Sequence, residues 1–161
     1  MRIGFGGGCH WCTEAVFQAL RGVERVEQGW ASSLDEPARF SEAVRVRFDA
    51  RVVPLEVLVA VHLHTHACTS RHPLRHKYRS AVYADDAGQA AAARAAIDEL
   101  RADFDAPVIT EVVRLGGFRQ NEPRYLDYYR TDPERPFCRR YISPKLAELR
   151  RRYGGRVREG Y

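Results

Sequence analysis

The sequence contains no apolar run of about 18 residues, which is the length that a membrane-spanning helix needs. Its first residues also lack the charged segment followed by an apolar stretch that marks a secretory signal. We therefore expect a cytoplasmic protein that has no membrane partner. With only four cysteines and no export signal, reactive or metal-binding thiols are a better interpretation than a disulfide framework.

The composition also lacks the signs of disorder. Of 161 residues, 45% are hydrophobic and 29% are charged, which is too apolar for a disordered chain and enough to build a core without a structural metal. The net charge of +5 raises the question of nucleic-acid binding. Because the arginines are spread through the chain, we expect a diffuse positive field and no nucleic-acid partner. We expect one domain over residues 1–161 and a monomer.

Apolar periodicity predicts alternating strands and helices. Residues 2–5 form a strand that enters a glycine loop, and an amphipathic helix over 12–20 follows and ends at Gly22. The segment 41–49 alternates apolar residues with arginine, as a half-buried strand does. Similar patterns predict strands over 23–30, 78–84 and 107–115, and helices over 55–63, 87–104 and 143–153.

The first six predicted elements have the order β-α-β-β-α-β. This is the order of the split βαβ, or ferredoxin-like, arrangement. We therefore predict an α+β fold with an antiparallel or mixed sheet, packed helices and an irregular C-terminal segment. No repeat or linker divides the chain.

The stretch GGGCHWC contains the strongest chemical signal. If the three glycines form a tight turn and Cys9 opens the helix, its sulfur faces unpaired backbone N–H groups and the positive end of the helix dipole. We therefore expect the pKa of Cys9 to lie below its free value, which favours the nucleophilic thiolate. Cys12 is three residues further and can reach Cys9 across the first helical turn. A buried structural cysteine on a glycine-rich turn is the alternative.

Zinc is a second use of a C-x-x-C pair, and it needs further ligands. The segment 62–76 is rich in histidine, but it contains no second C-x-x-C and its H-x-H-x-H pattern crosses a predicted helix end. We therefore expect most of these side chains to be solvated and no metal to be bound. The candidate ligands for a zinc site would be His62, His64, His66, Cys68, His72 and His76.

Four blocks of the sequence resemble the methionine sulfoxide reductase A family, in the family's order. GGGCHWCTEAVF looks like the signature GCFWG-x-E-x-x-F, and SEAVRVRFD is similar to HAEVV-x-V-x-FD. KYRSAVY resembles QYRS-x-I-x, and PFCRRYISPKL resembles GYC-x-x-x-I-x-PKL. The resemblance implies a thiol-dependent enzyme that reduces the S epimer of methionine sulfoxide, in proteins or as the free amino acid, and so repairs oxidative damage. It implies no cofactor.

The resemblance implies a role for each matched residue. The Cys9 thiolate would attack the sulfoxide sulfur while an acid protonates the oxygen, which leaves Cys9 as a sulfenic acid and releases methionine. Glu42 matches the family's acid. To donate a proton it must be protonated near neutral pH, so we expect it in an apolar, desolvated pocket. Tyr78 would hydrogen-bond the sulfoxide oxygen, and Trp11 would contact the S-methyl group.

A second thiol must then condense with the sulfenic acid, and the resemblance implies that a thioredoxin-like protein reduces the resulting disulfide. Cys138 matches the family's GYC cysteine. Cys12 replaces the glycine that follows the family's tryptophan and is nearer in sequence. Both remain candidate resolving cysteines, and Cys68 is a weaker third.

Several residues depart from the family pattern around the expected substrate pocket. His10 replaces phenylalanine, so one wall of the methyl pocket would be polar, and as an imidazolium it would lower the pKa of Cys9. Trp30 replaces a tyrosine that would bind the oxygen, and its indole N–H is a partial substitute. Pro73 replaces an aspartate, and NEPRYLDYY, residues 121–129, loses a His-Gln pair.

These departures predict retained sulfenic-acid chemistry with altered substrate affinity or range. Two alternatives stay open. One is a paralogue that reduces another sulfoxide, and the other is a zinc-binding or redox-sensing C-x-x-C module without turnover.

Overall fold

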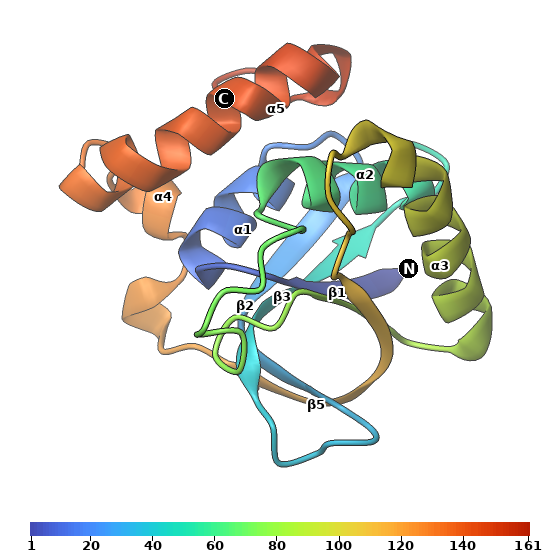
Figure 1. Cartoon of the computed structure of the whole chain (residues 1–161). Helices are drawn as coiled ribbons and strands as arrows, with labels where there is room; N and C mark the ends of the chain where they lie inside the picture. The colour runs from blue at the N-terminus through green and yellow to red at the C-terminus, as the bar shows by residue number, and fades with distance from the viewer.

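The computed structural model describes all of residues 1–161 and contains five strands and five α-helices (Figure 1). A π-helical turn at Cys138–Ile142 precedes the last of these helices. The strands are β1 (Arg2–Gly6), β2 (Val23–Ser33), β3 (Ser41–Phe48), β4 (Ala81–Ala84) and β5 (Glu111–Gln120). The helices are α1 (His10–Gln18), α2 (Leu55–Thr65), α3 (Ala87–Leu100), α4 (Tyr128–Thr131) and α5 (Ser143–Tyr153).

The sheet closes on itself as a five-stranded barrel. Strands β4, β1, β3 and β2 lie side by side in that order and are antiparallel. In the ferredoxin-like arrangement that the sequence predicts, the sheet would consist of these four strands and would stay open at its two edges. Instead β5 pairs antiparallel with β2 and parallel with β4, so both edges are joined. The mixed α and β class is therefore as predicted, whereas the sheet is a closed barrel.

Alternation along the strands separates two buried layers. Ile3 and Phe5 of β1 pair with Val46 and Val44 of β3, and all four side chains belong to the main core beneath the helices. The intervening residues face the barrel interior, where Tyr83 is fully buried. A Cβ atom added at Gly4 would lie 2.9 Å from the Cβ of Tyr83, so the barrel has room for glycine but not for a larger residue there.

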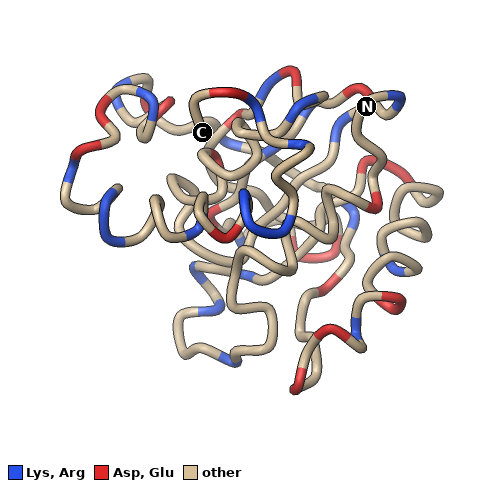
Figure 2. Tube along the Cα trace, turned by 90° about the horizontal axis from the view of Figure 1, so that it is seen from above, with Lys and Arg blue, Asp and Glu red and all other residues tan.

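Helices α1 and α2 cover one side of the sheet, and α5 crosses outside them (Figure 1). Lys and Arg are interspersed with Asp and Glu around the whole trace (Figure 2). None of the helices combines the length and the hydropathy that crossing a membrane would take.

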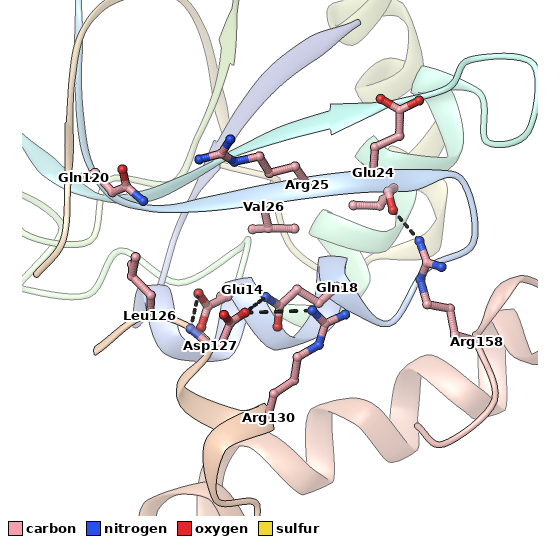
Figure 3. A pocket seen from close by; sticks show the side chains of 11 residues that line it. Glu14, Gln18, Glu24, Arg25, Val26, Gln120, Leu126, Asp127, Arg130 and Arg158 are labelled. Atoms are coloured by element: carbon pink, nitrogen blue, oxygen red, sulfur yellow. Dashed lines mark hydrogen bonds and ion pairs between the residues drawn. The ribbon is translucent and has the colours of Figure 1, made fainter. Parts of the chain in front are cut away.

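A buried carboxylate attaches the C-terminal segment to α1. Glu14 is 1% exposed, and its two oxygens accept the backbone N–H groups of Asp127 and Tyr128, each at 3.0 Å. Gln18, one turn further along α1, donates to the Asp127 side chain at 2.6 Å (Figure 3). Asp127 is the one non-glycine residue with a positive φ, so these bonds hold a left-handed backbone in place.

Two stacked histidines of the α2 region support the glycine turn that precedes Cys9. His62 Nε2 donates to the carbonyl of Gly6 at 2.7 Å, and the His62 and His66 rings lie 4.1 Å apart. The His66 ring fills the space beside Gly7, where an added Cβ would lie 2.5 Å from its Cδ2. Gly7 has a φ of 151°, so both its backbone conformation and its neighbour require glycine.

The histidine support makes the fold sensitive to acid. Burial lowers the pKa of His66 to about 4, whereas in the unfolded chain an imidazole takes up a proton near 6.5. The unfolded state therefore binds more protons between these values, and stability falls as the pH drops from about 6.5 to 4. For His66 alone the loss is at most about 3 kcal/mol.

Urea unfolding at several pH values tests this expectation. His66→Gln should lose less stability than the wild type between about pH 7 and 4, because glutamine does not titrate there. His76→Gln is the matched control, since His76 is exposed and should leave the wild-type loss unchanged. An equal loss in the wild type and His66→Gln would contradict the assignment.

Candidate active site

Cys9 lies where the glycine turn meets the first helix. It is the N-cap residue of α1, and its carbonyl accepts the backbone N–H groups of Cys12 and Thr13 at 3.1 and 3.2 Å. Its own sulfur makes no capping hydrogen bond, and the residue is half-buried. The predicted position at the start of a helix, with a reachable sulfur, is therefore what the structure shows.

Cys9 and Cys12 line the same small cavity, and the backbone N–H of Cys12 donates to the carbonyl of Cys9 at 3.1 Å. The neighbouring Cys12 thiol raises the pKa of Cys9, and burial adds to the effect. The Cys9 thiol in turn lowers the pKa of Cys12, against the opposing effect of burial. The pKa of Cys9 is thus raised where the sequence predicted a lowered value, and Cys12 is the sulfur on which the charge is stabilised.

Lys145 places a positive charge beside this dithiol. It is the third residue of α5 and lines a small cavity that Cys9 and Cys12 also line. Burial lowers the pKa of Lys145, while the two thiols oppose that shift. Its ammonium group donates to the carbonyl of Thr65. The lysine therefore favours a thiolate at Cys12, whose pKa it lowers.

A larger cavity of about 210 Å³ reaches Cys9 from the other side. Tyr78 and Arg75 lie in its wall, so the tyrosine is where the sequence places an oxygen ligand. Arg75 fixes that wall because its Nη1 donates to the carbonyls of Gly7 and Tyr78 at 2.8 and 3.0 Å. The remaining nitrogens of Arg75 donate to the carbonyls of Ser70 and Ala67.

Glu42 lies on β3 and is 6% exposed. Its Oε1 accepts the backbone N–H of His10 at 3.3 Å, and its Oε2 lies 3.6 Å from Lys77 Nζ. Glu42 also acts electrostatically on both Cys9 and Cys12, so it belongs to the same site. The carboxyl is buried as predicted, but its surroundings are polar where the sequence predicted an apolar pocket.

The His10 ring has a defined tautomer. Its Nδ1 lies 2.8 Å from the carbonyl of Gly29, and because a carbonyl only accepts, Nδ1 carries the hydrogen. Asn121 Nδ2, which donates to Gln28 Oε1 at 2.7 Å, faces His10 Nε2 at 3.4 Å. In a neutral ring Nε2 therefore carries a lone pair and no hydrogen. This nitrogen lies 3.3 Å from Glu42 Oε1.

The structure corrects the charge expected at His10. Burial lowers the pKa of His10, against the opposing hydrogen bond to Gly29 and the nearby Glu42 charge. The ring is therefore neutral near pH 7, and the prediction that an adjacent imidazolium lowers the pKa of Cys9 is wrong. Its nearest polar neighbours are Gly29, Glu42 and Asn121.

The two tryptophans lie in different surroundings. Trp30 of β2 meets the His10 ring edge-on at 5.1 Å. Trp11 stacks on Tyr128, with ring centroids 4.1 Å apart and planes 5° apart, and Phe137 packs edge-on at 5.3 Å. Its buried Nε1 has no hydrogen-bond partner. The sequence predicts that Trp11 contacts the methyl group of the substrate. Tyr128 of the C-terminal segment covers one face of its indole.

The remaining cysteines are both buried. Cys138 is fully buried in the π-helical turn, and Cys68 is 2% exposed. Burial raises the pKa of each thiol. The histidines that a zinc site would need are hydrogen-bonded elsewhere, His62 to Gly6 and His66 to Ser80. No group of three or more His, Cys, Asp or Glu is placed to hold a metal.

Sequence reasoning assigned no role to three residues that the structure brings to this site. Lys145 is the lysine of the matched PKL block, so its place at the site could have been predicted from that motif. Lys77 directly precedes the matched YRS tyrosine but belongs to no motif of its own. Arg75 had no signal, because its bonds to backbone carbonyls leave no pattern in the sequence.

Comparisons with known proteins agree with this geometry. The family model described as peptide methionine sulfoxide reductase matches residues 1–156. The peptide methionine sulfoxide reductase MsrA of Ralstonia nicotianae is 39% identical over 94% of this chain and 90% of its own. Among solved structures, methionine sulfoxide reductase A of Corynebacterium diphtheriae has a TM-score of 0.71 at 24% identity, covering 82% of this chain and 74% of its own.

Mxr1 from Saccharomyces cerevisiae, solved in complex with Trx2, has a TM-score of 0.64 at 19% identity and covers 76% of this chain and 81% of its own. The structural likenesses agree on the fold, and the sequence matches span nearly the whole chain. The chain therefore belongs to the peptide methionine sulfoxide reductase family and is an enzyme that reduces methionine sulfoxide.

Proposed function

We propose that the chain reduces the S epimer of methionine sulfoxide by a dithiol mechanism in which Cys9 attacks and Cys12 resolves. The observation that carries the proposal is that the two cysteines lie within one helical turn and line the same small cavity, with the backbone N–H of Cys12 donating to the carbonyl of Cys9 at 3.1 Å. Transfer of one proton from the Cys9 thiol to the Cys12 thiolate places the negative charge on Cys9. The half-buried Cys9 then faces the cavity that holds Tyr78.

In the first step the Cys9 thiolate attacks the sulfoxide sulfur. The oxygen is transferred to Cys9, which becomes a sulfenic acid, and the two-electron reduction of the sulfoxide releases methionine. The Tyr78 hydroxyl donates a hydrogen bond to the oxygen as charge develops on it. Trp11 and Trp30 are the proposed aromatic contacts for the substrate, although Tyr128 covers one face of Trp11.

Glu42 supplies the proton. With His10 neutral and Nδ1 protonated, its Nε2 lone pair faces Glu42 Oε1 at 3.3 Å. A protonated Glu42 carboxyl can donate either to this lone pair or to the sulfoxide oxygen, which requires a proton in the transition state.

In the second step the Cys12 sulfur attacks the Cys9 sulfenic acid, a disulfide forms and water leaves. Cys12 lines the same small cavity as Cys9, and Lys145 favours its thiolate. Cys138 belongs to the same buried cluster as Cys12, and we propose that thiol exchange carries the disulfide on to Cys138. The complex of Mxr1 with Trx2 supports a thioredoxin-like reductant. We propose oxidised proteins or free methionine sulfoxide as the substrate.

The activity is tested with a racemic methyl sulfoxide and dithiothreitol, by following both epimers on a chiral column. We expect loss of one epimer only and no loss with Cys9→Ser, because serine is a far weaker nucleophile toward sulfur. Cys68→Ser is the matched control and should retain the wild-type rate. Turnover by Cys9→Ser, or loss of both epimers, would exclude the mechanism.

The resolving cysteine is identified by peptide mass spectrometry after one turnover without reductant. The wild type should contain the Cys9–Cys12 or Cys12–Cys138 disulfide. Cys12→Ser should accumulate a Cys9 sulfenic acid that dimedone traps, whereas Cys138→Ser should still form Cys9–Cys12. A Cys9–Cys138 disulfide that forms equally fast in Cys12→Ser would show that Cys138 is the direct resolver.

Glu42→Gln should lower the rate of the reductase step by roughly 10²-fold or more, because an amide cannot supply the proton. The defect should grow between about pH 6 and 9, as solvent protons become scarcer. Single-turnover release of methionine measures it. Glu27→Gln, which changes a carboxylate paired with Arg45 away from the thiols, should leave the rate unchanged. An effect of Glu42→Gln that is constant over this pH range would argue against the acid role.

A further inference from the structure

A second cavity adjoins the one that reaches Cys9. Its volume is about 420 Å³, and His72 and Arg75 line both cavities, so the two share a wall. A ligand bound with its sulfur at Cys9 can therefore extend past this wall into the second cavity. The other side chains that line it come mainly from the 71–80 loop, from the segment before β3 and from the start of β5.

The lining of this second cavity is basic. Its charged residues are four arginines and one carboxylate, namely Arg39, Arg71, Arg75, Arg79 and Glu111. The imidazole of His72 adds a further polar group. Glu111 is engaged by Arg79, with contacts at 2.8 and 3.2 Å. Glu36, which lies outside the lining, accepts from both Arg79 and Arg39.

Two of the four arginines have no carboxylate partner. Arg71 is exposed and makes no hydrogen bond or ion pair with the protein. Arg75 donates only to backbone carbonyls, which satisfy its N–H groups but do not neutralise its charge. The cavity therefore presents a positive potential that the protein leaves uncompensated, and Arg71 has its whole donor fork available for an anion.

We propose that this cavity binds a carboxylate of the substrate, with Arg71 as its principal ligand and Arg39 as a second. The carboxylate would belong to an acidic side chain next to the oxidised methionine in a protein, or to the α-carboxylate of the free amino acid. The proposal rests on the mechanism above, because it takes Cys9 as the point of attack. It makes acidic sulfoxide substrates the preferred class of this enzyme.

The test compares substrates that differ only in charge. The first pair is two blocked peptides with glutamate or glutamine beside methionine sulfoxide. The second pair is N-acetylmethionine sulfoxide and its uncharged amide. In the wild type at low salt, kcat/KM should be at least about threefold higher for the acidic member of a pair, and added salt should reduce the difference. The pair that shows the larger ratio identifies the source of the carboxylate.

Arg71→Gln should abolish the preference by lowering kcat/KM for each acidic substrate toward the value for its uncharged partner. Arg39→Gln should reduce it. Arg150→Gln is the matched control, because Arg150 is also exposed and unpaired but lies on α5, and it should keep the full preference. Equal kcat/KM for acidic and neutral substrates in the wild type, or a preference that survives in Arg71→Gln, would overturn the proposal.

The uncharged substrates separate the two proposals. If the wild type reduces them but shows no charge preference, the basic cavity is not a carboxylate site and the dithiol mechanism stands. If neither the acidic nor the uncharged substrates are reduced, the mechanism at Cys9 has failed. A threefold preference with normal turnover of the uncharged substrates supports both.

Discussion

The position of Cys9 depends on the guanidinium group of Arg75. This group bridges the glycine turn before Cys9 and the loop that carries Tyr78, by donating to the carbonyls of Gly7 and Tyr78. Two segments that are nearly seventy residues apart in sequence are thereby held at a fixed spacing. An arginine suits this task because its planar fork presents five donors, whereas a lysine ammonium has three on a single atom. Cys9 and Tyr78 consequently belong to one wall of the cavity, with fixed spacing.

One departure from the family pattern meets a buried amide in space. His10 replaces a phenylalanine, and Asn121 begins the segment in which the family's His-Gln pair is lost. The structure places Asn121 Nδ2 3.4 Å from His10 Nε2 and fixes the amide through Gln28. A phenylalanine at position 10 would leave this buried amide with an unused donor, which is costly. His10 and Asn121 therefore satisfy each other's polar groups, and together with Gln28 they orient the ring that faces Glu42.

Most of the elements could be predicted from local periodicity, because amphipathic patterns depend only on which face is buried. The closure of the barrel could not. The alternation of residues 107–115 identifies a strand but not its partners, and β5 pairs with β2 and β4 through contacts far apart in sequence. At the site, motif matches located Cys9 and Glu42. The direction of the Cys9 pKa could not be predicted, because it depends on the rotamers that bring two sulfurs together.

Lys145 links the electrostatics of the dithiol to its redox cycle. In the reduced enzyme the buried ammonium lies beside a thiolate, which offsets the cost of burying its charge. In the proposed Cys9–Cys12 disulfide, that negative charge would be gone and the ammonium would keep only the Thr65 carbonyl. The lysine would therefore stabilise the reduced state over the oxidised one, as a positive charge near any thiolate must. Because a stabilised thiolate makes a disulfide more oxidising, Lys145 would, in the proposed mechanism, also favour reduction of the disulfide.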